Sequence, residues 1–178
     1  MRTKNNKFFF QRIRLKTDRE GVTLLEVLVV IGLLSLMTVL SLPNIRNALE
    51  TRDLENQARD IASTMQRAKF QAVKSKLNHR VRFEDLGGYW VFYIEREETP
   101  STWTLMPGMV KKPVPTKYNI TINLPSFIAT FSPLGFVTDF DTNLNSVVLQ
   151  SPKLNRFGQP DQRIVSVFAG GSVRYVKN

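Results

Sequence analysis

The feature that most constrains this chain is an apolar run, Val22 to Leu42, that contains a single charged residue. Fifteen of its 21 residues are Val, Leu, Ile or Met, and the only charge belongs to Glu26. A helix of this length is about 31 Å long, close to the thickness of a bilayer's hydrocarbon core. The sequence therefore predicts a transmembrane helix over residues 22–42. Glu26 needs an explanation, since an acid at the centre of such a helix costs about 2.5–3.5 kcal/mol and less near its ends.

The segment before this run is strongly basic. Residues 1–21 carry seven Lys or Arg side chains against Asp18 and Glu20, so half of the net charge of +10 lies there. Basic flanks stay on the cytoplasmic side of a membrane helix. We therefore expect residues 1–20 in the cytoplasm and the C-terminal part on the outer side of the membrane, and we assign this share of the charge to a targeting leader.

A second helical pattern follows Pro43 and is amphipathic. Apolar residues recur at spacings of four, three, four, three and four, which marks one face of a helix. They are Leu54, Ala58, Ile61, Met65, Ala68 and Ala72. Residues 43–78 are therefore predicted to form a helical spine that continues the first helix past Pro43 and buries one stripe against the rest of the chain.

After Asn78 the pattern changes to short strands separated by turns. Residues 79–83 and 89–94 flank a Gly-containing turn and predict a hairpin, whereas residues 98–117 read as a loop with at most one short strand. Further strands are expected at 118–124, 127–132, 146–150, 163–168 and 172–176, with a tight turn at 169–171. The expected fold is α+β, with a long N-terminal helix packed on an antiparallel β domain, residues 79–178.

The start of the chain resembles the type IV pilin superfamily. Gly21 ends a basic leader, Glu26 is the fifth residue after it, and the apolar run around Glu26 is followed directly by Pro43. The resemblance implies a pilin-like fold, cleavage between Gly21 and Val22 by a prepilin peptidase, and N-methylation of Val22. Family members most often begin with Phe where this chain has Val22, a departure that bears on methylation more than on cleavage.

Two other interpretations of the N-terminus remain. An ordinary secretory signal could be cut after Ser41, but the run exceeds the usual 7–15 residues and Glu26 has no purpose in it. A signal anchor that carries a binding domain without a polymer explains the length, but neither Gly21 nor Glu26. In the pilin interpretation, Glu26 pairs with the free amine of Val22 on a neighbouring subunit, or on its own chain, because a buried charge is costly unless it is paired.

The C-terminal part resembles the GspH/FimT group of minor pseudopilins and minor type IV pilins. The matching features are Phe131, Pro133 and Gly135, followed by a closing strand–turn–strand. The lack of cysteine departs from major pilins and suits this group better. The resemblance implies a GspH-like minor pseudopilin in the periplasmic pseudopilus of a type II secretion system. The alternative is a FimT/FimU-like minor pilin. The implied partners are other pilin-like subunits, the prepilin peptidase and an inner-membrane assembly platform.

The sequence offers little for catalysis. His79 is the only histidine and cysteine is absent, which excludes a multi-His or Cys-based metal site and a thiolate nucleophile. No phosphate-binding loop, serine-hydrolase motif or dinucleotide motif occurs. The chain is therefore predicted to be no enzyme and to need no cofactor.

Basic residues after the leader form two groups. The first group lies between residues 67 and 82, where no acid occurs, and the second begins at residue 153. Their members are Arg67, Lys69, Lys74, Lys76, Arg80 and Arg82, and then Lys153, Arg156, Arg163, Arg174 and Lys177. A solvated face or a subunit contact is the favoured use. DNA binding is the alternative, since clustered cations attract phosphates.

Overall fold

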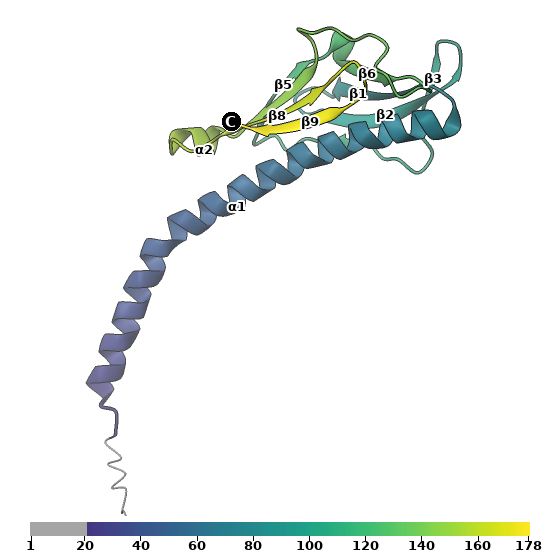
Figure 1. Cartoon of the computed structure of the whole chain (residues 1–178). Coiled ribbons are helices and arrows are strands. Elements are labelled where there is room, and N and C mark those ends of the chain that lie inside the picture. Colours follow the sequence, from purple (N-terminus) through teal and green to yellow (C-terminus); the bar gives the residue numbers. More distant parts are fainter. Residues whose placement is uncertain (1–20) are drawn as a thin grey trace, which may run out of the picture. The chain divides into compact units, whose positions relative to one another are not determined.

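A computed structural model describes residues 21–178, except for the side chains of residues 40–44. The predicted leader, residues 1–20, lies outside the described residues. Helix α1 spans Leu24–Ser75, and the chain divides into two units between Leu42 and Pro43. The two units are described separately below, and Figure 1 shows the elements of each.

In the first unit, the large apolar side chains of α1 are exposed. Every described side chain from Val22 to Val39 is exposed, including those of Leu24, Leu25 and Met37. Within the described residues, no helical stretch combines the length and the apolar character that a membrane crossing requires.

In the second unit, α1 buries the predicted stripe. All six stripe residues, from Leu54 to Ala72, have no solvent-exposed surface. The stripe predicted from the 3.6-residue period is therefore confirmed. The helix also continues past Pro43, as predicted. The helix ends at Ser75, slightly before the predicted end, and the next residue, Lys76, has a left-handed φ of 60°.

The first sheet has the strand order β3-β2-β1-β6, and β4 also pairs with β2. The predicted hairpin is confirmed, because β1 and β2 pair antiparallel from His79↔Arg96 to Asp85↔Trp90. The prediction for residues 98–117 was wrong in part, since β3 and β4 both add to β2. The strand bounds are β1 His79–Asp85, β2 Trp90–Thr99, β3 Thr102–Leu105, β4 Lys112–Pro113 and β6 Ile128–Phe131.

The second sheet has the order β5-β7-β8-β9, entirely antiparallel. Its strands are β5 Asn119–Asn123, β7 Ser146–Gln150, β8 Gln162–Val167 and β9 Val173–Lys177, close to the predicted ranges. The tight turn between β8 and β9 is confirmed by the bond from the Gly171 amide to the Phe168 carbonyl, 2.7 Å. Two short helices were not foreseen, the 3-10 helix η1 Pro125–Phe127 and the α-helix α2 Pro152–Arg156.

One hydrophobic core joins the second half of α1 to both sheets. The inward-facing residues alternate along the strands, as expected for sheets with one covered face. They are Val81 and Phe83 on β1, Phe92 and Ile94 on β2, Ala129 and Phe131 on β6, Val147 and Leu149 on β7, and Val165 and Val167 on β8. Figure 1 shows the second half of α1 running along the sheets of this domain. The predicted packing of the helix on an antiparallel β domain is confirmed.

Candidate functional site

The predicted processing and assembly residues lie at the start of the described chain. Gly21, Val22 and Glu26 are all exposed. The Thr23 hydroxyl accepts a hydrogen bond from the Glu26 amide at 3.2 Å, which is the Thr-x-x-Glu pattern of a helix N-terminus. Sequence reasoning missed this role. Glu26 is also an acid in the first turn, where the helix dipole favours negative charge. The first-turn position is therefore a local explanation of this carboxylate, and it competes with the assembly pair.

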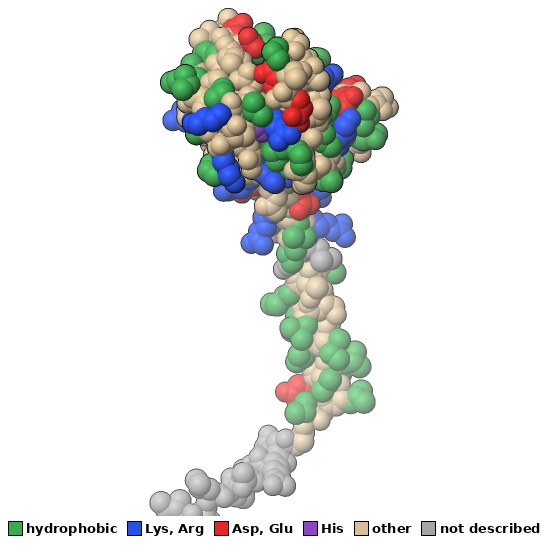
Figure 2. Space-filling view, turned by 90° about the vertical axis from the view of Figure 1, so that its right-hand side faces the viewer, with side chains coloured by type: hydrophobic (Ala, Val, Ile, Leu, Met, Phe, Trp, Pro, Cys, Tyr) green, Lys and Arg blue, Asp and Glu red, His purple; other side chains and the backbone are tan. Residues whose placement is uncertain are grey.

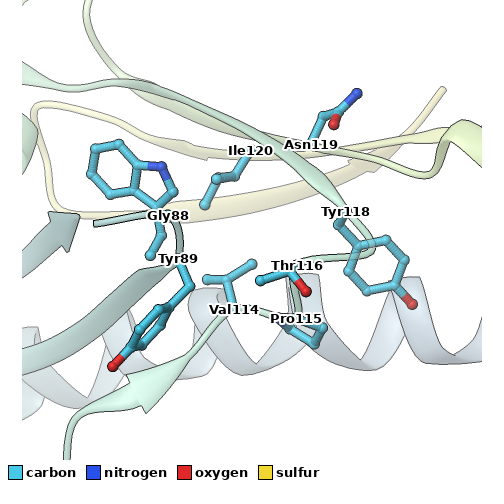
Figure 3. A pocket seen from close by; sticks show the side chains of 9 residues that line it. Gly88, Tyr89, Val114, Pro115, Thr116, Tyr118, Asn119 and Ile120 are labelled. Atoms are coloured by element: carbon cyan, nitrogen blue, oxygen red, sulfur yellow. The ribbon is translucent and has the colours of Figure 1, made fainter. Parts of the chain in front are cut away.

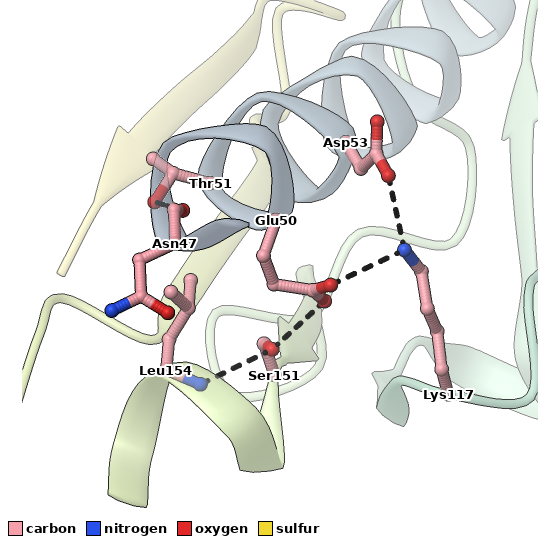
Figure 4. Close-up of polar contacts among 7 residues, drawn as sticks. All are labelled: Asn47, Glu50, Thr51, Asp53, Lys117, Ser151 and Leu154. Carbon is pink, nitrogen blue, oxygen red and sulfur yellow. Dashed lines mark hydrogen bonds and ion pairs between the residues drawn. The ribbon is translucent and has the colours of Figure 1, made fainter. Parts of the chain in front are cut away.

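A buried polar network fastens the spine to the β domain. Glu50 on α1 is 8% exposed, and its carboxylate accepts a hydrogen bond from the Ser151 hydroxyl at 3.1 Å. The same carboxylate lies 3.4 Å from the Lys117 ammonium, which also donates to Asp53 at 3.1 Å. Figure 4 shows Glu50 between Ser151 and Lys117. Three segments distant in the sequence therefore meet at one carboxylate.

Charge and capping both stabilise this network. Burial opposes the charged form of Lys117, but contacts with Tyr118 and Asp53 and the charge of Glu50 outweigh burial and raise the pKa of Lys117. The Ser151 hydroxyl accepts from the Leu154 amide at 3.4 Å and so caps α2. Sequence reasoning missed Glu50. Its position four residues before Leu54 extends the buried stripe by one turn, and that spacing was the available signal.

The Phe131, Pro133 and Gly135 motif marks a junction between the two sheets. The Val137 amide donates to the Ala169 carbonyl at 2.9 Å, which ties the loop after β6 to the β8–β9 turn. At Gly171, an added Cβ would lie 2.0 Å from the Gly135 carbonyl oxygen, so the two backbones touch directly. Both glycines have left-handed φ values, 84° at Gly135 and 68° at Gly171. The motif therefore has a packing role, and Gly135 and Gly171 meet where side chains have no room.

The first basic group is divided between structural bonds and exposed positions. Lys69 donates to the Gly170 carbonyl at 3.1 Å, beside the glycine junction. Arg80 pairs with Glu95 at 2.6 Å, and its guanidinium lies 4.1 Å from the centre of the Trp103 ring. Arg82 is half-buried on β1. The exposed members are Arg67, Lys74 and Lys76 on and just after the last turns of α1.

The second basic group differs more from its prediction. Arg163 was placed in a surface group, but its side chain is completely buried on the core side of β8. Its guanidinium donates to the carbonyls of Pro160 and Gln162 and lies 3.5 Å from Glu55, which Lys177 also approaches to 3.5 Å. Burial is tolerated because the charge is paired and hydrogen-bonded. The exposed members are Lys153, Arg156, Arg174 and Lys177.

Some members of the two basic groups lie far apart. Lys153 follows Ser151, which is bonded to Glu50 in the middle of α1, whereas Lys69 and Lys74 lie near the C-terminal end of this helix. Helix rise separates Glu50 from Lys74 by roughly 36 Å. Figure 2 shows Lys and Arg side chains at several separate places on one face of the β domain, with acidic and hydrophobic side chains between them.

The described residues that line one pocket on the β domain lack the side chains of a catalytic or metal site. This pocket, of about 310 Å³, lies between the start of β2 and the segment leading into β5. Figure 3 shows Val114 and Ile120 across this pocket from one another, with Tyr89 and Tyr118 at its sides. In the described part of the chain, His, Asp and Glu side chains nowhere gather in threes that could hold a metal ion. His79 is 2% exposed, and its Nδ1 lies 3.0 Å from the Leu77 carbonyl oxygen.

Comparison with known proteins gives one structural similarity. No family model matches the sequence, and no curated protein matches it. The structure is similar to that of the minor pseudopilin EpsH from the type 2 secretion system of Vibrio cholerae. The identity is 13% and the TM-score 0.49, over 69% of this chain and 95% of that one.

Proposed function

We propose that this chain is a non-enzymatic, membrane-anchored subunit of a pilin-like filament. Its apolar run, Val22–Leu42, crosses the inner membrane, and the β domain lies in the periplasm. A prepilin peptidase cuts after Gly21, and an inner-membrane platform inserts the mature chain among other pilin-like subunits. The exposure of the apolar side chains from Val22 to Val39 supports this proposal, because such a surface must be covered by lipid or by other helices.

The observation that carries the proposal is the place of Glu26. It is the only charge in the run and the fifth residue after Gly21. Cleavage after Gly21 creates an amine on Val22. In a staggered assembly, that amine meets Glu26 of a neighbouring chain where an unpaired charge costs several kcal/mol. The charge pair stabilises the assembled state and sets the stagger between subunits.

Within this class, we propose a GspH-like minor pseudopilin of a type II secretion system. The motif at Phe131, Pro133 and Gly135 and the closing β8–β9 hairpin support the GspH/FimT group, to which this candidate belongs. The alternative is a minor type IV pilin of the FimT/FimU kind. Deleting the gene and measuring enzyme export and pilus number in the same cells separates the two. Lost export with normal pili supports the pseudopilin, and lost pili with normal export supports the alternative.

The central experiment replaces Glu26 by Leu or Gln. We expect both variants to enter the membrane and to be cut after Gly21, since the peptidase reads the glycine. We expect incorporation into sheared filaments to fall sharply, because the Val22 amine loses its charged partner. Mass spectrometry of the N-terminus follows cleavage, and fractionation of filaments against membranes follows incorporation. Normal incorporation of both variants would contradict the proposed charge pair.

Thr23→Val supplies the matched control. It removes the hydroxyl that accepts from the Glu26 amide but keeps the carboxylate. Loss of an N-cap costs about 1 kcal/mol of helix stability. If Glu26 serves assembly, Thr23→Val filaments should form normally. If Glu26 serves only as part of the cap, Thr23→Val should be as defective as Glu26→Gln.

DNA binding is the second candidate function. The observation in its favour is the exposure of Arg67, Lys74 and Lys76 in a part of the chain without acids. Weak, salt-dependent binding of duplex DNA by the full chain in detergent is the expected result. Replacing all three by Gln should remove a gel shift seen at low salt. Absence of any shift at tens of micromolar protein excludes this function.

A further inference from the structure

The two outer strands of the second sheet differ in charge. Strand β9 carries Arg174 and Lys177, both exposed, and charges on an outer strand discourage pairing with another chain. Strand β5 has the sequence Asn-Ile-Thr-Ile-Asn and carries no charge and no proline. On its outer side, β5 pairs with no strand of the described chain. Pairing with a strand of another chain is therefore disfavoured at β9 and unhindered by charge at β5.

The hydrogen-bonding pattern shows which groups β5 presents. The Ser151 amide donates to Asp161 and the Val167 amide to Asn145, so odd-numbered residues of β7 bond toward β8. Even-numbered residues of β7 therefore bond toward β5, and they pair with Asn119, Thr121 and Asn123. The backbone amides and carbonyls of Ile120 and Ile122 consequently point outward from the edge.

The sequence of this edge reads the same in both directions. Asn119 and Asn123 flank Ile120 and Ile122, and Thr121 is the centre. Antiparallel pairing of two identical strands about Thr121 would therefore place Ile opposite Ile and Asn opposite Asn. We propose that β5 pairs antiparallel with β5 of a second copy of this chain, about a two-fold axis at Thr121.

The backbone geometry fits this register. Ile120 of one copy faces Ile122 of the other, and both residues present free amides and carbonyls. Two such pairs make four hydrogen bonds. Thr121 faces Thr121 in a non-hydrogen-bonded pair with a Cα separation of about 4.5 Å. Isologous contacts of this kind give closed dimers and no open chains of strands.

Part of this edge borders open volume. Asn119 and Ile120 line the pocket of about 310 Å³ seen in Figure 3, so open volume borders the first half of the edge. The Thr121 side chain is exposed, while those of Ile120 and Ile122 are half-buried. The contact is small, and we expect weak association that depends on local concentration. It uses the β domain alone, so it goes beyond the proposed filament contacts of the N-terminal helix.

Cysteine cross-linking tests the axis directly, because the natural chain has no cysteine. Full-length Thr121→Cys chains in cells should form a disulfide dimer on mild oxidation, since about 4.5 Å between Cα atoms lies within the disulfide range. Thr102→Cys is the matched control, an exposed threonine on the outer strand β3. Equal cross-linking of the two variants would overturn the proposal.

The register has its own test. Asn119 of one copy faces Asn123 of the other, so a mixture of Asn119→Cys and Asn123→Cys chains should cross-link. Each variant alone should not, because four residues of strand separate identical positions from contact, about 13 Å. Cross-linking of Thr121→Cys without cross-linking of the mixture would indicate parallel pairing and would also overturn the proposal.

Charge reversal provides a measurement without cysteine. Thr121→Lys places two like charges opposite one another and should reduce co-purification of differently tagged full-length chains about fivefold. Thr121→Glu should do the same, and co-expression of one Lys chain with one Glu chain should restore pairing. Thr121→Val should leave pairing intact. If the Lys–Glu mixture co-purifies no better than either variant with itself, β5 is not the contact.

Discussion

The two halves of helix α1 are both rich in apolar residues, yet only one of them buries a stripe. From Val22 to Val39, every described side chain is exposed. From Leu54 to Ala72, six apolar residues on one face are fully buried while Arg59 and Arg67 on other faces are exposed. The first half is apolar on all faces and the second on a single face.

The difference follows from periodicity more than from hydrophobicity. A stripe at spacings of three and four gives the helix one face to bury, and the β domain supplies the cover. A helix that is apolar all round has no polar face to keep in water, so it needs surroundings that are apolar on every side. Trp90 and Trp103 are the only tryptophans, so fluorescence reports on the β domain alone.

The largest expected effect is in the buried stripe. Ile61→Ala should lower the free energy of unfolding of the β domain by about 2–5 kcal/mol, because it removes a fully buried side chain and leaves a cavity. Ile45→Ala is the control, on the same helix but 54% exposed, and should change it by less than about 0.5 kcal/mol. Urea unfolding of the full chain in mild detergent measures both. Equal losses would mean that burial does not distinguish these positions.

The next effect lies where the two sheets meet beneath the end of α1. Gly171→Ala should destabilise the domain by about 2–3 kcal/mol, since its Cβ would lie 2.0 Å from a backbone oxygen and its φ is 68°. Gly158→Ala has a similar φ of 61° and nothing within 4 Å of the new Cβ. It should cost about 1 kcal/mol. The difference between the two midpoints of urea unfolding isolates the close approach, and no difference would argue against it.

Sequence reasoning reached the parts of this molecule that depend on local pattern. The period of the stripe predicted all six buried positions, and the turn at residues 84–88 predicted the β1–β2 hairpin. It failed where contacts with distant segments determine whether a strand forms or a side chain is buried. Strand β3 exists because β2 extends to Thr99 and offers an edge, and Arg163 is buried because Glu55, 108 residues away, lies within 3.5 Å of it. A charged residue on a strand looks exposed until its partner is known.

Glu26 in the first half of α1 and Glu50 in the second half can be compared as two acids on one helix. Glu50→Leu should lower the free energy of unfolding by about 1–3 kcal/mol, because Ser151 and Lys117 lose their acceptor in a buried setting. Glu26→Leu should leave unfolding of the β domain unchanged, since Glu26 is exposed and far along the chain from the tryptophans. A double-mutant cycle with Ser151→Ala should give a coupling of about 1 kcal/mol. Additive effects would show that the 3.1 Å bond contributes nothing.

The smallest effect concerns His79, which lies just beyond the end of the covered half. Burial, followed by the charge of Arg96, lowers the pKa of His79 against the opposing bond to the Leu77 carbonyl. The unfolded chain therefore takes up a proton first, near pH 6.5, while the folded imidazole stays neutral. Stability is present at pH 7.5 and falls as the pH drops through this window, by at most about 1.4 kcal/mol per pH unit, and stops falling below the folded pKa. His79→Gln removes this titration, so the loss of stability between pH 7.5 and 5.5 should be smaller in the variant than in the natural chain. Because every other titrating group is shared, the difference between the two urea profiles belongs to His79. Parallel profiles would show that protonation of the ring costs nothing, and that the β domain does not cover the chain beyond the last turn of α1 as tightly as it covers the stripe.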